Sequence, residues 1–308
     1  GGENTDSEEA RWCVSVDAGN SWSDVKSIDS GSEPGIGVSH GAFLSHGGQL
    51  WAFQAAYHGI MKDVHTRAYV LDEKSGRWQA QGKVIGEGFW PMQQPQKMDD
   101  GNWIMAGLKV GDGNPAIVAI SHGSDFTNWD AVPIRVAPAV TTMWGESTVI
   151  VDGKQVLNIS RYGAEAKALV AVSEDYGRTW SEMRSSNLPM ATSKPCAGVL
   201  SNGQRYLICT TTADSGSRRS PLTIAVTRPG KAALSKIFVI RHAEISSGPG
   251  ESHPKAALAY PYAIEHQGEL YVGYSNSGGG VGRVGKNREL WNNNSAELAI
   301  IPLEKLQH

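Results

Sequence analysis

The chain has 308 residues, a formal net charge of −3 and only 19% charged residues. The slightly negative charge argues against nucleic acid as a partner, and no apolar run reaches the roughly 18 residues that span a bilayer. Glycine and tryptophan are frequent, with 36 and 10 copies, which suits one large all-β domain of short strands joined by tight turns. We therefore interpret residues 1–308 as a single domain.

Glycine-containing turn signals recur along the chain at a nearly constant interval. The first four follow one another at roughly 50 residues, which is within the range of propeller-blade repeats. Apolar, β-rich segments flank each signal, so each one predicts a hairpin. The signals lie at residues 46–49, 99–102, 152–153, 201–204 and 267–268.

Two octets, residues 15–22 and 173–180, share the pattern Ser-x-Asp-x-Gly-x-(Ser/Thr)-Trp. An aspartate can bond to the backbone two residues on, and glycine supplies a positive φ, so the pattern predicts a tight, self-bonded turn between two strands. The tryptophan is expected to lie over the turn and to bury a large apolar area. Degenerate copies that keep the tryptophan occur at residues 72–78 and 121–129.

The octets resemble the Asp box, or BNR repeat, of the sialidase superfamily, which lies at the turn between the third and fourth strands of a propeller blade. The resemblance implies an all-β, six-bladed β-propeller of four-stranded antiparallel blades, with structural rather than chemical roles for the octets. The first blade is incomplete at the N-terminus, and we expect residues before Gly1 to supply its inner strands. A five-bladed ring whose two chain ends share one blade is the alternative. The predicted blades are residues 11–30 (two strands), 36–85, 88–137, 141–186, 190–242 and 254–303.

The three cysteines lack the spacing of metal ligands. Cys196 and Cys209 are equally distant from the turn at Asn202-Gly203, so a simple hairpin would make them face each other. A pair of buried free thiols is favoured over a cross-strand disulfide, because cysteine is commonly buried without bonding. We expect no cofactor and no obligatory metal.

In a propeller the first strand of each blade lines the central channel, where function is sought. The chain places polar and aromatic residues there, which are poor filler for a sheet core. They predict a sugar-binding floor, and a channel plug that binds only water is the alternative. The residues are His40, Trp90, Gln93, Trp144, Lys194, His253, Lys255 and Tyr262.

The resemblance extends to charged and tyrosine residues. Glu146 opens a segment that ends in Asp-Gly, and Arg161 follows at the end of the next strand, as in sialidases. Arg219 resembles the family's arginine of the following blade, and Tyr260 its last-blade tyrosine, with Tyr262 as the competing choice. The resemblance implies that the arginines hold a carboxylate and that Glu146 activates the tyrosine as nucleophile. A purely structural Glu146–Arg161 pair is the alternative.

The sequence departs from the family at two places. The Phe/Tyr-Arg-Ile-Pro motif that carries a third arginine is absent, and the family's acidic aspartate in the second blade has no convincing match. His40 stands nearer the channel entrance in that blade and is our third catalytic candidate.

The resemblance implies an exo-acting, sialidase-like glycoside hydrolase for a terminal acidic sugar. It would act on an oligosaccharide or glycoconjugate in a secreted or periplasmic location. A propeller polysaccharide lyase with a His or Tyr base, cleaving beside a uronic acid, is the second hypothesis, which the pair His40 and His253 favours. The third is a non-catalytic, glycan-binding propeller.

Overall fold

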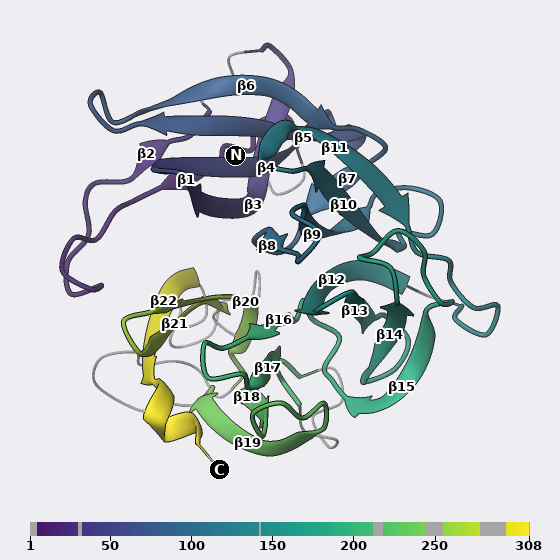
Figure 1. The fold of residues 1–308 in the computed structure, drawn as a ribbon. Coiled ribbons are helices and arrows are strands. Elements are labelled where there is room, and N and C mark those ends of the chain that lie inside the picture. Colours follow the sequence, from purple (N-terminus) through teal and green to yellow (C-terminus); the bar gives the residue numbers. More distant parts are fainter. Residues whose placement is uncertain are drawn as a thin grey trace. The chain divides into compact units, whose positions relative to one another are not determined.

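The computed structural model describes residues 5–29, 33–141, 143–211, 218–243, 255–277 and 294–307. Within these ranges the regular structure is β-strand, apart from one short 3-10 helix, η1 (Leu303–Leu306) (Figure 1). None of the described helices is long and apolar enough to cross a membrane. The chain forms two compact units: unit 1 consists of Gly1–Arg135, Gly153–Val156 and Val172–Ser181, and unit 2 of Val136–Asp152, Leu157–Ala171 and Glu182–His308.

Unit 1 contains two larger antiparallel sheets and a two-stranded ribbon. In one sheet the strands follow chain order, β3-β4-β5-β6. In the other, β7 and β8 both pair with β9, so that the first strand position is split, and β10 and β11 follow. The strands are β1 (Arg11–Trp12), β2 (Lys26–Ser27), β3 (Ile36–His46), β4 (Gln49–His58), β5 (Lys62–Asp72), β6 (Arg77–Ile85), β7 (Phe89–Pro91), β8 (Gln96–Lys97), β9 (Trp103–Lys109), β10 (Ala116–His122) and β11 (Asp125–Pro133).

Unit 2 contains the greater part of the sheet β12-β13-β14-β15 and all of the sheets β16-β17-β18-β19 and β20-β21-β22. Each sheet again follows chain order, as expected of hairpin-connected strands. The strands are β12 (Met143–Asp152), β13 (Gln155–Tyr162), β14 (Lys167–Ser173), β15 (Arg184–Pro189), β16 (Cys196–Val199), β17 (Arg205–Cys209), β18 (Leu222–Thr227), β19 (Leu234–Arg241), β20 (Ala257–His266), β21 (Glu269–Ser277) and β22 (Asn294–Pro302).

The predicted repeat boundaries agree with the observed sheets. The predicted hairpin turns join the first two strands in four of the sheets and join β8 to β9 in the fifth. The count of six blades is not confirmed: the described residues form five blade-type sheets, and β1 and β2 pair only with each other. The ribbon β1-β2 is the two-stranded part predicted for residues 11–30.

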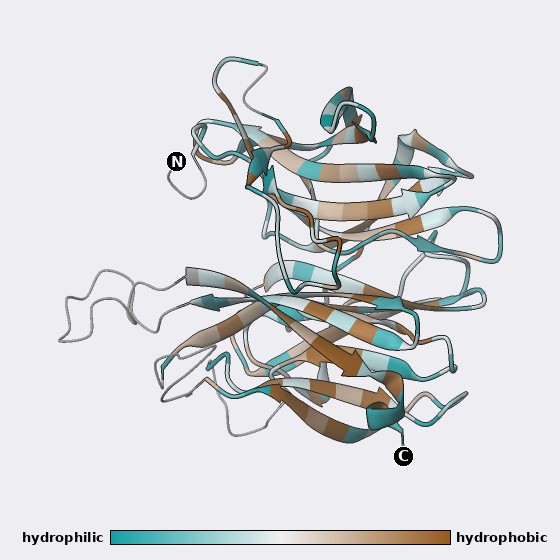
Figure 2. Ribbon diagram, turned by 90° about the vertical axis from the view of Figure 1, so that its left-hand side faces the viewer, coloured by the Kyte–Doolittle hydropathy of each residue, from teal (hydrophilic) through white to brown (hydrophobic). Residues whose placement is uncertain are grey.

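Each sheet buries one set of alternating side chains against its neighbour within the same unit. In β21 every second residue is buried, which is the period of a strand with one face in the core. Figure 2 shows the corresponding apolar bands along the strands. In unit 1, Trp51 and Phe53 of β4 pack with Phe126 and Trp129 of β11. In unit 2, one core joins the sheets that contain β16 and β20, and another joins those that contain β12 and β16.

The two octets fold into the same hydrogen-bonded turn. Asp17 accepts from the Ser21 amide and hydroxyl, and Asp175 accepts in the same way from Thr179. The aspartate therefore reaches four residues on, and not two as predicted, because the serine that opens each octet binds the turn glycine instead.

The tryptophans of the two octets differ. The Trp180 indole donates to the Gly177 carbonyl at 2.8 Å and so lies over its turn, as predicted. A β-carbon on Gly177 would meet Ile104 Cδ1 at 2.6 Å, so this turn packs tightly against β9. Trp22 is 53% exposed, and the predicted burial is wrong for it.

The two buried cysteines are free thiols, as favoured from the sequence. They do not face each other, however. Cys196 pairs with Ile208, because the β16–β17 turn closes through an odd number of residues and moves the register by one position. A one-residue shift puts the side chains on opposite faces of a sheet, and the thiols of Cys196 and Cys209 accordingly lie in different cores.

Candidate functional site

A cluster of charged and aromatic side chains lies in unit 2, on strands β12, β13 and β20 and on the segments that precede β16 and β18. Glu146 lies on β12 and is 3% exposed. Arg161, near the end of the neighbouring strand β13, donates from Nη1 to Glu146 Oε2 at 2.8 Å. A buried carboxylate requires such a partner, because an unpaired charge in a protein interior is strongly disfavoured. The predicted pair of Glu146 and Arg161 therefore forms.

Thr192 links the two arginines of the cluster. Its Oγ1 accepts from Arg161 Nε at 3.2 Å, and its carbonyl accepts from Arg219 Nη2 at 3.3 Å. Each guanidinium has five N–H donors, so these bonds leave donor capacity on both arginines. Arg219 also lies over the ring of Tyr260, with its Cζ 5.5 Å from the ring centroid.

Tyr260 occupies a β-bulge in β20. The register with β21 changes between Ala259, which pairs with Ser275, and Tyr262, which pairs with Gly273, so one additional residue is inserted. Tyr260 has a φ of 54°, a left-handed conformation that is a genuine outlier for a bulky side chain. Bulges re-aim side chains beside active sites, and strained residues of this kind cluster there. Here the bulge directs the Tyr260 hydroxyl to a hydrogen bond with Glu146.

Burial raises the pKa of Tyr260, the negative charge of Glu146 raises it further, and Arg219 and Arg161 oppose the rise. The phenol is therefore protonated at neutral pH. A tyrosine in this setting reacts as a nucleophile only if its proton leaves during the reaction, and Glu146 is the hydrogen-bonded group that can take it.

Lys194 and Tyr262 lie beneath the bulge. The Lys194 side chain is 1% exposed. Its Nζ donates to the Pro261 carbonyl at 2.8 Å and lies 3.7 Å from the centroid of the Tyr262 ring. Burial lowers the pKa of Lys194 to about 8, against a smaller raising effect of Cys196 and Glu146. Burial likewise raises the pKa of Tyr262. At neutral pH the cluster thus combines three cationic side chains with one carboxylate.

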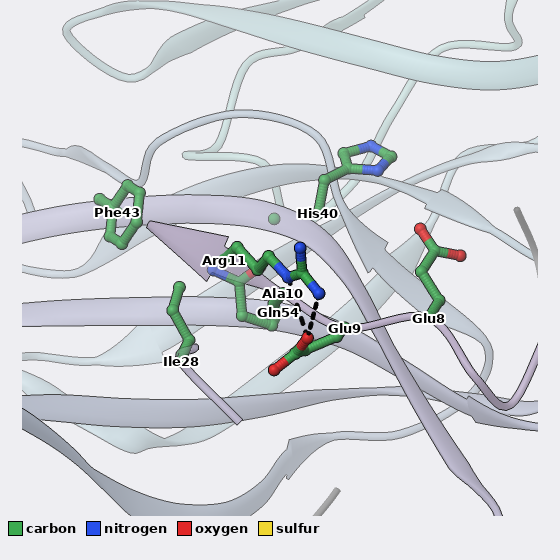
Figure 3. A pocket seen from close by; sticks show the side chains of 9 residues that line it. Glu8, Glu9, Ala10, Arg11, Ile28, His40, Phe43 and Gln54 are labelled. Atoms are coloured by element: carbon green, nitrogen blue, oxygen red, sulfur yellow. Dashed lines mark hydrogen bonds and ion pairs between the residues drawn. The ribbon is translucent and has the colours of Figure 1, made fainter. Parts of the chain in front are cut away.

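Unit 1 holds a separate cavity of about 300 Å³. It is lined by the segment before β1, by β3 and by β4 (Figure 3). The exposed His40 imidazole and the aromatic ring of Phe43 lie along β3, and the Glu9–Arg11 ion pair crosses the view between them. A ring, an imidazole, carboxylates and the buried amide of Gln54 are groups that recur in sites for small polar ligands.

A hydrogen-bonded network surrounds the bulge of β3 that carries His40. The register of β3 changes between Val38 and Gly41, which marks a bulge at Ser39-His40. Ser39 Oγ donates to Glu8 Oε1 at 2.6 Å, and the Tyr57 hydroxyl donates to Glu8 Oε2. Predicted residue Trp90 is buried, and its indole donates to the His40 carbonyl at 3.1 Å.

The remaining predicted residues are placed as follows. Gln93 is buried in unit 1, between β7 and β8. Trp144 is half-buried two residues before Glu146 on β12, and therefore lies on the same face of that strand. Lys255 is exposed just before β20, and His253 lies outside the described residues. Among the described residues no group of three or more His, Cys, Asp or Glu is arranged to hold a metal ion.

Sequence reasoning did not identify Thr192, the Pro261 carbonyl or the Glu8–Tyr57 pair. Thr192 carries only the signal that it lies two residues before Lys194, in the segment that leads into β16. A backbone acceptor has no sequence signal, and the contact between Glu8 and Tyr57 joins residues 49 positions apart. These contacts depend on tertiary structure that local patterns do not contain.

The five antiparallel, blade-type sheets of the described residues are those of a β-propeller. The chain belongs to the family of the BNR repeat-like domain, whose model matches residues 1–272. A comparison with curated protein sequences returns no match.

Several solved structures share the fold. A Dyadobacter fermentans protein of unknown function has a TM-score of 0.71 and 14% identity, over 98% of this chain and 86% of that one. A Hadza microbial sialidase has a TM-score of 0.67 and 16% identity, over 94% and 59%. The NanB sialidase of Streptococcus pneumoniae has a TM-score of 0.67 and 10% identity, over 99% and 65%. This chain thus spans less than two thirds of these sialidases.

Proposed function

We propose that the protein is a sialidase-like glycoside hydrolase that removes a terminal acidic sugar from a glycan. The observation that carries the proposal is the Tyr260–Glu146 hydrogen bond at the bulge of β20, with Arg161 and Arg219 beside it. Such an arrangement is difficult to explain as packing, because it holds a tyrosine in a left-handed conformation next to a buried carboxylate.

The two arginines account for an acidic substrate. Guanidinium groups bind carboxylates through two parallel hydrogen bonds. Arg161 is 18% exposed at its side chain and Arg219 is half-buried, so both retain access to a ligand. The net positive charge of the cluster would favour an anion over a neutral sugar.

In the proposed reaction the Tyr260 oxygen attacks the anomeric carbon while its proton passes to Glu146. The glycosidic bond breaks, and the leaving oxygen takes a proton from a general acid. Water then attacks the anomeric carbon and gives a proton to the conjugate base of the general acid, while the leaving tyrosine oxygen regains its proton from Glu146. A neutral tyrosine suits an anionic sugar because it adds no repulsive charge before the proton moves. His40, our third catalytic candidate, lies in unit 1 beside the separate cavity, and the proposed reaction assigns it no step.

The experiment compares turnover of sialylated, uronate-bearing and neutral glycans by the wild type and two tyrosine variants. Tyr260→Phe removes the hydroxyl that is bonded to Glu146, and we expect at least a thousandfold loss of kcat. Tyr271→Phe is the matched control, because Tyr271 donates to Glu269 at 3.0 Å in the same sheet, outside the cluster. We expect this control to stay within twofold. Equal activity of Tyr260→Phe and wild type on every substrate would refute the assignment.

A polysaccharide lyase is the second candidate, and the exposed His40 imidazole in the unit 1 cavity favours it. A lyase needs a base to remove the C5 proton beside a uronate and a cation to neutralise the carboxylate. Its product contains a carbon–carbon double bond that absorbs in the ultraviolet, whereas a hydrolase product does not. New ultraviolet absorbance during turnover would therefore replace the hydrolase proposal with the lyase. Binding of an acidic glycan without turnover would indicate a non-catalytic role.

A further inference from the structure

The bulge that presents Tyr260 contains two residues that disturb a regular strand. Pro261 has no N–H group, so it cannot donate to a neighbouring strand, and Tyr260 has an unfavourable φ of 54°. Conformations of this kind persist only where surrounding groups hold them. Ser275 of β21 donates to the Ala259 carbonyl at 3.0 Å before Tyr260, and a contact with the residues after Tyr260 would hold the bulge on its other side.

Lys194 supplies that contact from the next sheet. It lies two residues before β16, and its ammonium donates to the Pro261 carbonyl at 2.8 Å while it covers the Tyr262 ring at 3.7 Å. These two contacts bind Lys194 to the two residues that directly follow Tyr260. The side chain is almost fully buried, so a substrate would find its ammonium already engaged by the protein.

We propose that Lys194 is a positioning residue, whose buried ammonium fixes the bulge at Pro261 and Tyr262 and thereby holds Tyr260 against Glu146. The inference rests on the proposed function for its effect on turnover. The structural part, that Lys194 immobilises the bulge, stands on the contacts alone. The groups that face the ammonium are Tyr262, Cys196 and Glu146.

The test replaces Lys194 with methionine, which keeps the length and removes the charge and the donor. Lys236→Met is the matched control, because Lys236 also donates to a backbone carbonyl, that of Gln307 at 2.9 Å, and lies 4.8 Å over the Phe238 ring. We measure hydrogen exchange in peptides that cover β20, and kcat and KM on the best substrate of the wild type.

For Lys194→Met we expect exchange at the bulge to become at least tenfold faster, while exchange in β13 stays unchanged. We expect kcat to fall about a hundredfold with KM within threefold, because a misplaced nucleophile impairs reaction more than binding. Lys236→Met should change neither. If Lys194→Met does not fold, Lys194→Gln, which keeps a neutral donor, is judged by the same criteria.

Two outcomes overturn the proposal. One is unchanged exchange at the bulge. The other is a KM raised more than tenfold with kcat retained, which would make Lys194 a substrate-binding residue. A wild type without turnover on any glycan defeats the proposed function instead, and the exchange experiment then decides the structural role of Lys194 by itself.

Discussion

The Glu146–Arg161 pair should show a marked asymmetry when its partners are removed one at a time. The Glu146 side chain is 4% exposed and that of Arg161 is 18% exposed. Arg161→Met leaves a buried carboxylate whose remaining hydrogen bond comes from Tyr260, and breaking a buried pair in this way destabilises by about 3–5 kcal/mol. Because the tyrosine bond compensates in part, we expect about 3 kcal/mol at pH 7.

Glu146→Gln should be milder. The amide oxygen still accepts from Arg161, and the arginine keeps Thr192 and some contact with solvent. Exchanging one charged hydrogen bond for a neutral one lowers stability by about 1 kcal/mol. In the double variant no charge is buried, so its loss should be smaller than the sum of the single losses by about 2 kcal/mol, which is the coupling of a contacting pair.

Urea unfolding followed by circular dichroism measures these differences, and hydrogen exchange in β12 and β13 localises them to the pair. The reasoning is refuted if the two single variants lose equal stability and the double variant loses the sum of the two losses. Such results would describe a pair that behaves like a solvent-exposed ion pair, with a contribution near zero.

Further predictions concern the turn, the buried lysine and the thiols. Gly177→Ala should lower the free energy of unfolding by about 2 kcal/mol, because Gly177 has a φ of 78° and an added β-carbon would clash with Ile104. Gly76→Ala, at a φ of 64° with open space around it, should lower the free energy of unfolding by about 1 kcal/mol. A larger loss for Gly76→Ala than for Gly177→Ala would contradict the packing argument. Lys194 has a pKa of about 8 in the folded protein and near 10.4 in the unfolded chain, so between these pH values the unfolded chain binds the extra proton. In urea titrations, the free energy of unfolding of the wild type should therefore rise by about 3 kcal/mol relative to that of Lys194→Met from pH 8 to 10.4. A stability difference that does not change with pH would be inconsistent with a buried ammonium. A thiol reagent should modify only Cys13 in the native protein and the two buried thiols after unfolding; rapid native reaction of more than one thiol would show that the cores are open.

The sequence predicted the repeat pattern because its determinants are local. Glycine-containing turns set the hairpins at a regular spacing, and the octet at residues 173–180 forms the turn between β14 and β15, the third and fourth strands of their sheet. The failures arise where one residue changes the register. The turn after β16 contains an odd number of residues, which separates Cys196 from Cys209, and Trp22 has no fixed neighbour implied by its octet.

The candidate site was predicted in part for the same reason. Glu146, Arg161, Arg219 and Tyr260 could be selected because residue type and position within a repeat resemble a known pattern. The bulge of β20 could not be predicted, since nothing in Ala259-Tyr260-Pro261 requires a left-handed tyrosine. The role of Lys194 depends on a backbone carbonyl 67 residues away. Contacts of this kind follow from how neighbouring sheets pack.

A comparison of the two bulges supports the view that they serve a function. Both lie in the first strand of their sheets, β3 and β20, and each inserts one of the residues selected for chemistry, His40 or Tyr260. A β-carbon on Gly41 would lie 1.7 Å from the Phe53 carbonyl oxygen, so the chain can follow the first bulge only with glycine at that position. In a regular strand, successive side chains point to opposite faces of the sheet, so the position of His40 or Tyr260 along its strand would fix the face on which it lies. Register shifts also occur in other strands, such as β5, so the functional argument rests on the side chains that these two bulges redirect, those of His40 and Tyr260.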